Sequence, residues 1–343
     1  MKTEKHLELI IPASLWPDAN SREAIWRDVS LPSLAQLYGK GRKSQLSQTS
    51  VEDYLASLFG LNDFAIAPLM LQQYSAELEP GFWLCADPIT LRVDRDHLTV
   101  LGEPYLQLSQ NEADALVAAL NQLYQPDGFH FIAPTPQRWF VRLPSNPQLE
   151  FTPFEKALGR NLNDVLPKGE GALKFNALLN EMQMLLYSHA VNDARDAAGQ
   201  LLINSLWLWG GGEFSGLQCG VTSHDKLGRA VHGQHAVVQA LSAAHAMPRQ
   251  YSDLVTNNAV VVLDDLQLHA IYGAGYEWQQ VWQSWESAWF TPALNALREG
   301  SLTSLTLTFT DVAEQITVRK SDLWRFWRRA ILPTHEGVAH VAD

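Results

Sequence analysis

Amide, guanidinium and glycine residues gather between residues 180 and 212, within otherwise apolar sequence. Burying such polar groups costs free energy unless each is hydrogen-bonded, so their density indicates either a structural network or a ligand site. Arg195 could hold a phosphate or carboxylate by two parallel hydrogen bonds, and glycine backbone could approach an anion closely. A capped helix end with an ordinary tight turn is the alternative. We predict an anion site formed by Asn192, Arg195, Asn204, Gly210, Gly211 and Gly212.

A second polar cluster lies earlier in the chain, in the phrases Ala86-Asp87-Pro88 and Asp94-Arg95-Asp96-His97. Carboxylates and a histidine this close together would suit metal binding or proton transfer. A charged hairpin turn is the alternative, because Asp is a common turn residue. We predict that Asp87 and Arg95 join the ligand site.

Histidines and cysteines give little support for a metal site. His232 and His235 are three residues apart, whereas a zinc pair on one helix face is usually spaced by four, so we expect a solvated helix face. The two cysteines, Cys85 and Cys219, lie far apart without a CxxC spacing and predict buried thiols. The sequence therefore predicts neither a bound metal nor another cofactor.

The elements that would position the ligand residues are a long helix and a buried strand. Apolar residues recur at helical spacing from Gly171 to about Ala198, and Gly199 is suited to ending a helix. The apolar run from Leu201 to Trp209 then indicates a strand that ends at the glycines. Trp207 and Trp209 share one face of this strand, so they contact either a ligand or a covering helix. Ligands of open α/β sheets bind at such carboxyl ends.

Shorter elements surround this segment. His6 to Ile11 has the pattern of a first buried strand. A helix from Glu277 to Glu299 carries four tryptophans on one face, at positions 278, 282, 285 and 289, which indicates a core position or a homodimer interface. After a short strand at 82–85, a small α+β block of about residues 86–150 combines a capped helix, Ser109 to Tyr124, with strands at 89–93, 98–101, 129–133 and 138–143.

The composition is that of an acidic globular protein. The 343 residues include 37 acidic and 25 basic side chains, giving a formal charge of -12 that disfavours attraction to nucleic acid. A basic run, Arg319 to Arg329, is interleaved with Trp324 and Trp327, but the overall charge still predicts no nucleic-acid partner. No run approaches the ~20 apolar residues that cross a bilayer, so we expect a cytoplasmic protein without a membrane partner.

Several phrases, spread over most of the chain, resemble a bacterial family of regulatory proteins, RpfE. The phrases that carry this resemblance are Ala86-Asp87-Pro88, Asp94-Arg95-Asp96-His97-Leu98, Asn180-Glu181-Met182-Gln183-Met184, His189-Ala190-Val191-Asn192 with Arg195, and Asn204-Ser205-Leu206-Trp207-Leu208-Trp209-Gly210-Gly211-Gly212. The resemblance implies a role in regulation.

The order of Asn192, Arg195, Gly199 and Asn204 before a glycine segment is also similar, more distantly, to archaeal-type cofactor-independent phosphoglycerate mutases. This resemblance implies an α/β fold of the alkaline-phosphatase-like class, a mixed sheet flanked by helices with an inserted small α+β domain. The domains it implies are a core of residues 1–85 and 171–333, an insertion of residues 86–170, and a flexible tail of residues 334–343.

The sequence departs from those mutases where their two metal ions would bind. The mutases carry an Asp-Gly motif after the first strand and late Asp-His motifs, whereas here Ile11-Pro12-Ala13-Ser14 follows the first strand. Because two-metal phosphoryl transfer needs those carboxylates, we predict a non-catalytic regulatory protein that binds a small phosphorylated anion or a protein partner.

Two alternatives stay open at this point. An active metal-dependent phosphomutase or phosphatase would use unconventional ligands, namely His224, Asp225, Asp264 and Asp265. A dimeric scaffold would instead use the tryptophan face of the helix at residues 277–299.

Overall fold

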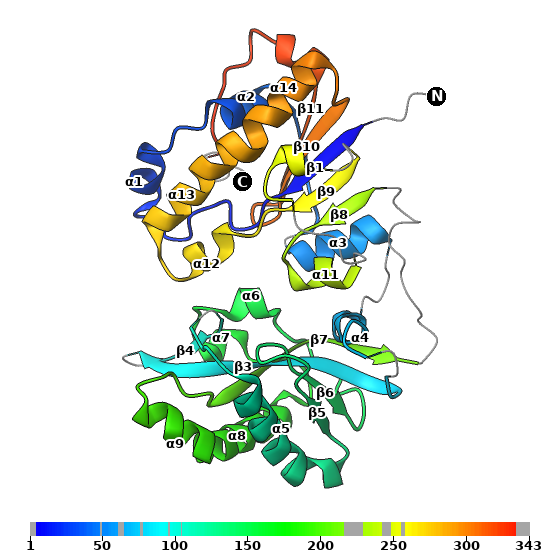
Figure 1. Cartoon of the computed structure of the whole chain (residues 1–343), viewed down its shortest axis with the longest axis vertical. Coiled ribbons are helices and arrows are strands. Elements are labelled where there is room, and N and C mark those ends of the chain that lie inside the picture. Colours follow the sequence, from blue (N-terminus) through cyan, green and yellow to red (C-terminus); the bar gives the residue numbers. More distant parts are fainter. Residues whose placement is uncertain are drawn as a thin grey trace. The chain divides into compact units, whose positions relative to one another are not determined.

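The structure, a computed structural model, divides the chain into two compact units (Figure 1). Unit 1 combines Met1–Asn62 with Val221–Asp343, and unit 2 is Asp63–Gly220, inserted between these two stretches. The structure describes residues 5–48, 50–60, 65–75, 78–94, 97–103, 105–215, 229–241, 248–254 and 258–333.

Unit 1 is built on a mixed sheet. Among the described residues its strand order is β2-β11-β10-β1-β9-β8. Strands β8, β9, β1 and β10 run parallel to one another, whereas β11 pairs antiparallel with β10 and β2 pairs antiparallel with β11. The strands are β1 (His6–Ile10), β2 (Arg42–Gln45), β8 (Ala230–His232), β9 (Ala259–Val262), β10 (Ser304–Phe309) and β11 (Glu314–Arg319).

Helices cover both faces of this sheet (Figure 1). Alternation along β1 sends Leu7 and Leu9 to one face, where they join the core under α1 (Arg22–Arg27), α2 (Pro32–Lys40), α12 (Leu266–Ile271), α13 (Gly275–Trp285) and α14 (Thr291–Glu299). Glu8 points to the opposite face, beneath α3 (Val51–Phe59), where it accepts a hydrogen bond from the hydroxyl of Tyr54. The short helix α11 (Ala236–Leu241) follows β8.

The predicted tryptophan helix is formed by α13, a π-helical segment η3 (Glu286–Phe290) and α14 in succession. Pro292, the second residue of α14, lies just after the π-helical segment, where the regular ladder of hydrogen bonds is already interrupted. The four indoles of this helix are buried in the core of unit 1, where Trp26 packs against two of them, Trp278 and Trp282. This favours the core interpretation of that face, and a homodimer would have to use another surface.

Unit 2 is built on an antiparallel sheet centred on β3 (Gly81–Asp94). One edge of β3 pairs with β7 (Ser205–Phe214). The first half of β3 also pairs with β6 (Phe140–Leu143), which pairs in turn with β5 (His130–Ile132), and its second half pairs with β4 (His97–Leu101).

Both faces of the unit 2 sheet carry helices (Figure 1). One face is covered by α5 (Gln110–Tyr124), α8 (Ala172–Tyr187) and α9 (Ala190–Ala197), whose apolar residues pack on the Phe82 and Leu84 side of β3. On the other face lie α4 (Ile66–Leu71), α6 (Phe154–Ala157) and α7 (Leu162–Val165). The predicted capping box of α5 is confirmed, since Ser109 and Glu112 exchange hydrogen bonds.

The structure differs from the expected boundaries in three places. The strands expected at 82–85 and 89–93 are one strand, because pairing with β7 continues past Pro88. The helix expected to end near Ala198 is divided into α8 and α9, since the side chain of His189 caps the second helix. Unit 2 is longer than the insertion expected at 86–170, because β7 pairs along most of β3.

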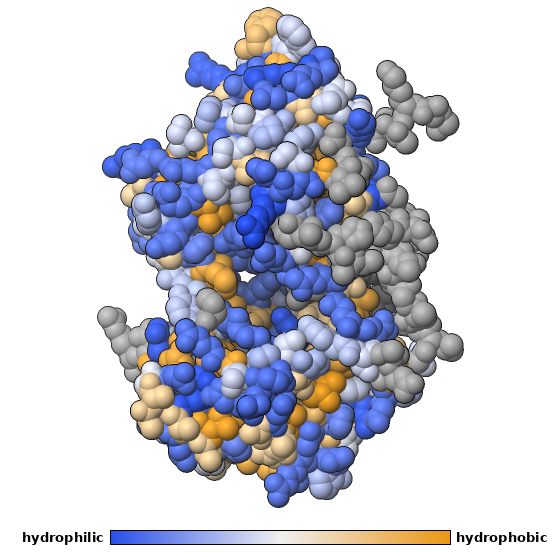
Figure 2. All heavy atoms as spheres, viewed as in Figure 1, coloured by the Kyte–Doolittle hydropathy of each residue, from blue (hydrophilic) through white to orange (hydrophobic). Residues whose placement is uncertain are grey.

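Two features of the structure relate to the predicted cytoplasmic environment, namely the composition of the surface and the length of the helices. In the space-filling view, hydrophilic residues predominate and hydrophobic residues form separate patches among them (Figure 2). Within the described part of the chain, no helix combines the length and the apolar character that crossing a bilayer requires.

Candidate functional site

The candidate site lies in unit 2, on the face of the sheet that carries α4, α6 and α7. Alternation along β3 places Trp83, Cys85 and Asp87 on this face. Cys85 pairs with Trp209 and Asp87 with Trp207 on β7, so both tryptophans share the face, as predicted. The face thus combines aromatic rings with the carboxylate of Asp87.

Asp87 is 1% exposed and is held by two donors. Its Oδ2 atom accepts hydrogen bonds from Nη1 of Arg138 and, at 2.7 Å, from Nε1 of Trp209. Its Oδ1 atom is buried and has no hydrogen-bond partner among the described residues. Burial raises the pKa of Asp87 above its ordinary value, and the charge of Arg138 only partly opposes this effect.

Arg138 completes the group from the segment that precedes β6. Its guanidinium lies 5.7 Å from the ring centroid of Trp209, in cation–π geometry. Its side chain is 19% exposed, so it is reachable from solvent. Nη1 donates a hydrogen bond to Asp87, and no described residue accepts a hydrogen bond from Nη2. Arg138 is not among the predicted site residues, because a single arginine at the start of an apolar hairpin carries no motif.

Cys85 lies on the same face and is fully buried. Burial raises the pKa of its thiol well above the ordinary value, and the charge of Asp87 raises it further. Since the thiolate is the reactive form, this thiol is chemically inert in the folded state. The prediction of a buried thiol is confirmed for Cys85, and Cys219 lies outside the described residues.

Arg195, the predicted anion ligand, makes three hydrogen bonds within unit 2. Nε donates to the carbonyl of Leu201 at 2.7 Å, Nη1 to Oε1 of Glu112 at 2.8 Å, and Nη2 to the carbonyl of Leu106. The side chain is 1% exposed. These contacts give Arg195 a structural role in tying α9 to the start of α5.

The two predicted asparagines also hydrogen-bond to backbone. Asn192 donates to the carbonyls of Leu186 and Ile203 at 2.7 and 2.9 Å and accepts from the N–H of Ile203 at 2.8 Å. Asn204 accepts from the N–H of Leu91 at 2.7 Å and donates to its carbonyl at 3.0 Å. The amide of Asn204 thus extends the β7 edge by one more pair, as a backbone group would.

The three glycines belong to β7, so the strand does not end before them. Gly210 has φ of +64°, and a side chain on Gly212 would place its Cβ 2.1 Å from Cβ of Ala65, next to α4. Close packing against α4 therefore accounts for glycine here. Of the other predicted ligand residues, Arg95 lies outside the described residues, and Trp207 donates from Nε1 to the carbonyl of Thr152 at 3.0 Å.

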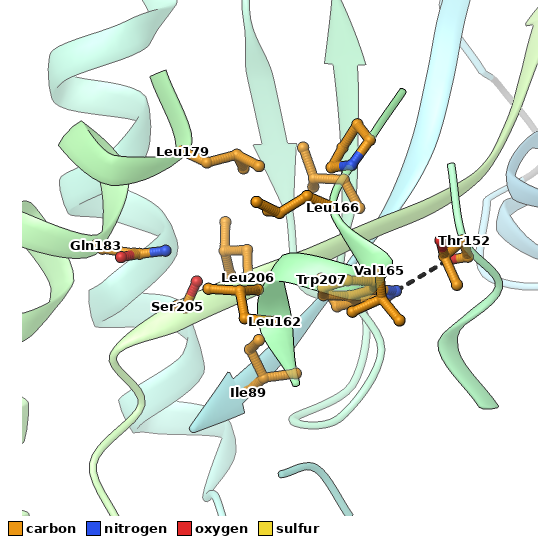
Figure 3. Close-up of a pocket in the computed structure, with 12 residues that line it drawn as sticks. Ile89, Thr152, Leu162, Val165, Leu166, Leu179, Gln183, Ser205, Leu206 and Trp207 are labelled. Carbon is orange, nitrogen blue, oxygen red and sulfur yellow. Dashed lines mark hydrogen bonds between the residues drawn. The ribbon is translucent and has the colours of Figure 1, made fainter. Parts of the chain in front are cut away.

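A cavity of about 10 Å³ lies nearby, between β7, α7 and α8 (Figure 3). Apolar side chains such as Leu162, Leu179 and Leu206 line most of it. A single water needs roughly 10–15 Å³ of such space. This cavity is therefore a packing void and is too small for a metabolite.

Unit 1 places further polar residues at the carboxyl ends of its parallel strands. Ser14, which follows β1, donates from Oγ to Oδ1 of Asp311 at 2.9 Å, and Asp311 follows β10. Oδ2 of Asp311 accepts from the N–H of Leu15 at 2.8 Å. Asp264 and Asp265 follow β9 at the same edge. This is the edge at which ligands of open α/β sheets bind.

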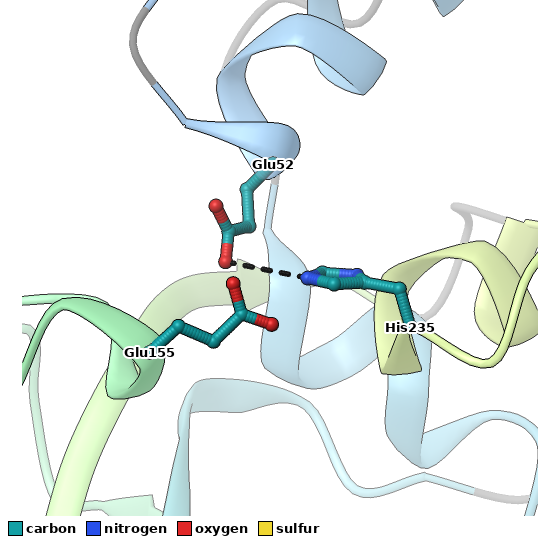
Figure 4. Close-up of side chains that lie close together, drawn as sticks. All are labelled: Glu52, Glu155 and His235. Atoms are coloured by element: carbon teal, nitrogen blue, oxygen red, sulfur yellow. Dashed lines mark ion pairs between the residues drawn. The ribbon is translucent and has the colours of Figure 1, made fainter. Parts of the chain in front are cut away.

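Two histidines of unit 1 are buried, so the prediction of a solvated helix face is wrong. His232 is the last residue of β8, and His235 lies just before α11. Nε2 of His235 is 3.7 Å from Oε1 of Glu52, at the start of α3 (Figure 4). Although burial raises the pKa of Glu52, the neighbouring His235 and polar groups at the start of α3 together outweigh that effect and lower it.

Comparison with known proteins relates the chain to one class of enzyme. It is 26% identical over 137 residues to a 2,3-bisphosphoglycerate-independent phosphoglycerate mutase of Methanosarcina mazei, covering 38% of this chain and 34% of the mutase. It is 24% identical over 191 residues to the corresponding protein of Methanosarcina acetivorans, covering 53% and 48%. The chain is remotely similar to these mutases. It spans less than half the length of the curated relatives it matches.

The fold is also found in a solved structure, the PH0037 protein from Pyrococcus horikoshii. The likeness has a TM-score of 0.50 at 11% identity and covers 93% of this chain and 89% of that protein. An α/β fold with a mixed sheet flanked by helices, as the mutase resemblance implied, is confirmed. No protein-family profile matches the chain, so membership of the RpfE family stays a prediction.

The two-metal centre of the mutase family can be compared with the residues of unit 1. Among its described residues, no three His, Cys, Asp or Glu side chains bring their ligand atoms together. Both carboxylate oxygens of Asp311 accept hydrogen bonds from the segment after β1. His224 and Asp225 lie outside the described residues. Of the four predicted metal ligands, the described part of unit 1 therefore contains only Asp264 and Asp265, at the edge that also carries Asp311.

Proposed function

We propose that this chain is a regulatory, non-catalytic relative of the phosphoglycerate mutases that binds a small phosphorylated anion through Arg138. The observation that carries the proposal is the arrangement of its guanidinium. Asp87 accepts from Nη1, the ring of Trp209 supports the group, and no described residue accepts from Nη2. A guanidinium fixed in this way loses little conformational entropy when it binds an oxyanion.

The proposal keeps part of the predicted site and replaces another part. Asp87 and Trp209 belong to it, as orienting residues of the arginine. Arg195 does not, because its three hydrogen-bonding nitrogens already have partners inside unit 2. The phosphorylated class of ligand follows from the remote similarity to mutases, whose substrates are phosphorylated, and the regulatory role from the RpfE resemblance.

Ligand-dependent thermal stability tests the proposal. The full chain is heated with 3-phosphoglycerate, with unphosphorylated glycerate or with neither, and we expect only the phosphorylated acid to raise Tm. Arg138→Gln removes the charge and should weaken binding by about 10- to 100-fold, the effect of one or two charge-assisted hydrogen bonds. Arg138→Lys keeps the charge without the planar fork and should bind with intermediate affinity.

Arg142→Gln is the matched control. Arg142 lies on β6, opposite Trp83, and pairs with Glu79 rather than with Asp87. This variant should bind the phosphorylated acid as the natural chain does. Equal stabilisation of the Arg138→Gln variant and the natural chain would reject the assignment, provided that circular dichroism shows both to be folded. An absence of stabilisation of the natural chain would reject it as well.

An active metal-dependent mutase is the second candidate. The observation that favours it is the polar edge of unit 1, where Ser14 and Asp311 are hydrogen-bonded beside the two aspartates that follow β9. Phosphorus NMR of the chain with 3-phosphoglycerate and manganese distinguishes the two. Conversion to 2-phosphoglycerate would establish the enzyme, whereas binding without conversion would support a non-catalytic protein.

A further inference from the structure

The segment from Arg319 to Ile331, which we call the aromatic-basic segment, follows β11 at the end of the described chain, in the red part of Figure 1. It includes the 3-10 helix η4 (Lys320–Trp324). Three large rings project from it into solvent: Trp324 is 77% exposed, Phe326 is 88% exposed and Trp327 is 68% exposed. Large rings with this exposure cost free energy in water unless another surface covers them.

The backbone of the aromatic-basic segment is fixed against unit 1. The Ile331 N–H donates to the carbonyl of Ala35 at 3.1 Å, and Nη1 of Arg328 donates to the carbonyl of Gly41. A Cβ on Gly39 would lie 2.1 Å from the carbonyl oxygen of Arg329, so glycine allows this close approach. The rings are therefore presented by an anchored loop.

Positive charge surrounds the rings. Residues 319 to 329 include five basic side chains and a single acidic one, Asp322. Asp322 is buried and is neutralised by Arg325 at 2.6 Å, so it does not offset the other cations. Arg319, Lys320, Arg328 and Arg329 are exposed. This local surface is cationic although the whole chain is acidic.

Although the sequence alone predicted no membrane partner, we infer that the aromatic-basic segment binds the surface of an anionic lipid bilayer. Indole and phenyl rings partition into the interface between headgroups and acyl chains, and basic side chains at the same depth contact the lipid phosphates. Each Lys or Arg close to an anionic surface strengthens binding about fivefold. Three rings together with four exposed cations supply the two kinds of signal that stable peripheral binding needs.

The geometry favours a lipid surface over single-stranded nucleic acid. Base stacking needs open ring faces that successive bases can cover. Phe326 and Trp327 instead stand edge to face, with ring centroids 5.1 Å apart and planes at 84°. A bilayer interface accepts rings in such an arrangement, because it requires no parallel faces.

Sedimentation with lipid vesicles tests the inference. The full chain is mixed with vesicles of phosphatidylcholine alone or of phosphatidylcholine with phosphatidylglycerol, at low and at high salt. We expect binding only to the anionic vesicles and weaker binding at high salt, because salt screens the attraction. Tryptophan emission should shift to shorter wavelength on binding.

Two double variants separate the contributions of rings and charges. Phe326→Ser with Trp327→Ser should weaken binding about tenfold or more, since two rings lose their apolar burial. Lys320→Gln with Arg329→Gln should weaken it about 25-fold at low salt. The matched controls are Tyr276→Ser, which removes a ring 69% exposed on α13, and Arg27→Gln, which removes an exposed cation on α1. Both should bind like the natural chain.

Three outcomes would overturn the inference. The first is an absence of binding to anionic vesicles at low salt. The second is loss of binding in the control variants to the same degree as in the double variants. The third is that the double variants bind vesicles as the natural chain does but lose another property of the natural chain, either binding to oligouridine or self-association.

Discussion

Trp209 lies diagonally across from Asp87 on the neighbouring strand, and its Nε1 donates a hydrogen bond of 2.7 Å to Oδ2 of that carboxylate. The same oxygen accepts from Arg138. One carboxylate therefore fixes both a ring and a guanidinium that lies over that ring. This relationship makes the orientation of Arg138 depend on a residue of β7.

Removing only the indole N–H should destabilise unit 2. Trp209→Phe keeps an aromatic ring but takes a donor from a buried carboxylate, and hydrogen bonds to charged groups contribute about 1.5–3 kcal/mol. We expect the free energy of unfolding in urea to fall by about this amount. Trp207→Phe is the control, since its N–H donates to the neutral carbonyl of Thr152 and should cost only about 0.5–1.5 kcal/mol. Equal losses in the two variants would contradict this account.

Arg195 should be needed for stability. Arg195→Met preserves much of the apolar stem but leaves Glu112 and two backbone carbonyls without their donor. Leaving a buried acceptor without its donor costs about 1–3 kcal/mol, and the Glu112 side chain, 26% exposed, remains partly solvated. Urea unfolding of this variant should show a loss of that size. A loss below about 1 kcal/mol, the value of an exposed pair, would show that the pair is solvated in solution.

The ion pair also predicts a dependence of stability on pH. Burial opposes ionisation of Glu112, but hydrogen bonds from Ser109 and the ion pair with Arg195 outweigh it and lower the pKa of Glu112. A lowered folded pKa stabilises the protein above the unfolded value of about 4.3, and this stability is lost as pH falls through the folded value. Glu112→Gln should therefore flatten the acid limb of the unfolding free energy below about pH 5. An unchanged acid limb would contradict the shift.

Local patterns predicted much of the fold. Helical spacing of tryptophans identified the helix that runs from α13 to α14, and the Ser109 and Glu112 spacing identified the start of α5. These signals act over a few residues, so the sequence displays them directly. The strand that was expected to end at Gly210 continues to Phe214, because glycine marks close packing against α4 as readily as it marks a turn.

The candidate site could not be predicted in the same way. Asp87 and Arg138 are 51 positions apart, and Arg195 and Glu112 are 83 apart, so no periodicity connects either pair. The pairing of β3 with β7 and the packing of α5 against α9 decide the surroundings of the two arginines. They enclose Arg195 among hydrogen-bond partners and leave Arg138 accessible. For the aromatic-basic segment, likewise, the sequence displays the composition, but it does not predict that the three rings are exposed.

The thiol of Cys85 should be unreactive in the folded protein. Burial, together with the charge of Asp87, raises its pKa, which suppresses the thiolate that attacks thiol reagents. In a Cys219→Ser background, which leaves a single cysteine, a chromogenic disulfide reagent should not label the native chain and should label it fully in urea. Rapid labelling of the native chain would contradict the burial of this strand.

The tight packing of β7 on α4 predicts the effect of one added methyl group. In Gly212→Ala the new Cβ would lie 2.1 Å from Cβ and 2.6 Å from Cα of Ala65, so the backbone itself must move. Overpacking of this kind costs about 1–3 kcal/mol, which urea unfolding would detect. Gly171→Ala is the control, because its nearest neighbours would be 3.9 Å away and its φ of -87° is open to any residue. A larger loss at position 171 than at position 212 would refute the packing described for α4.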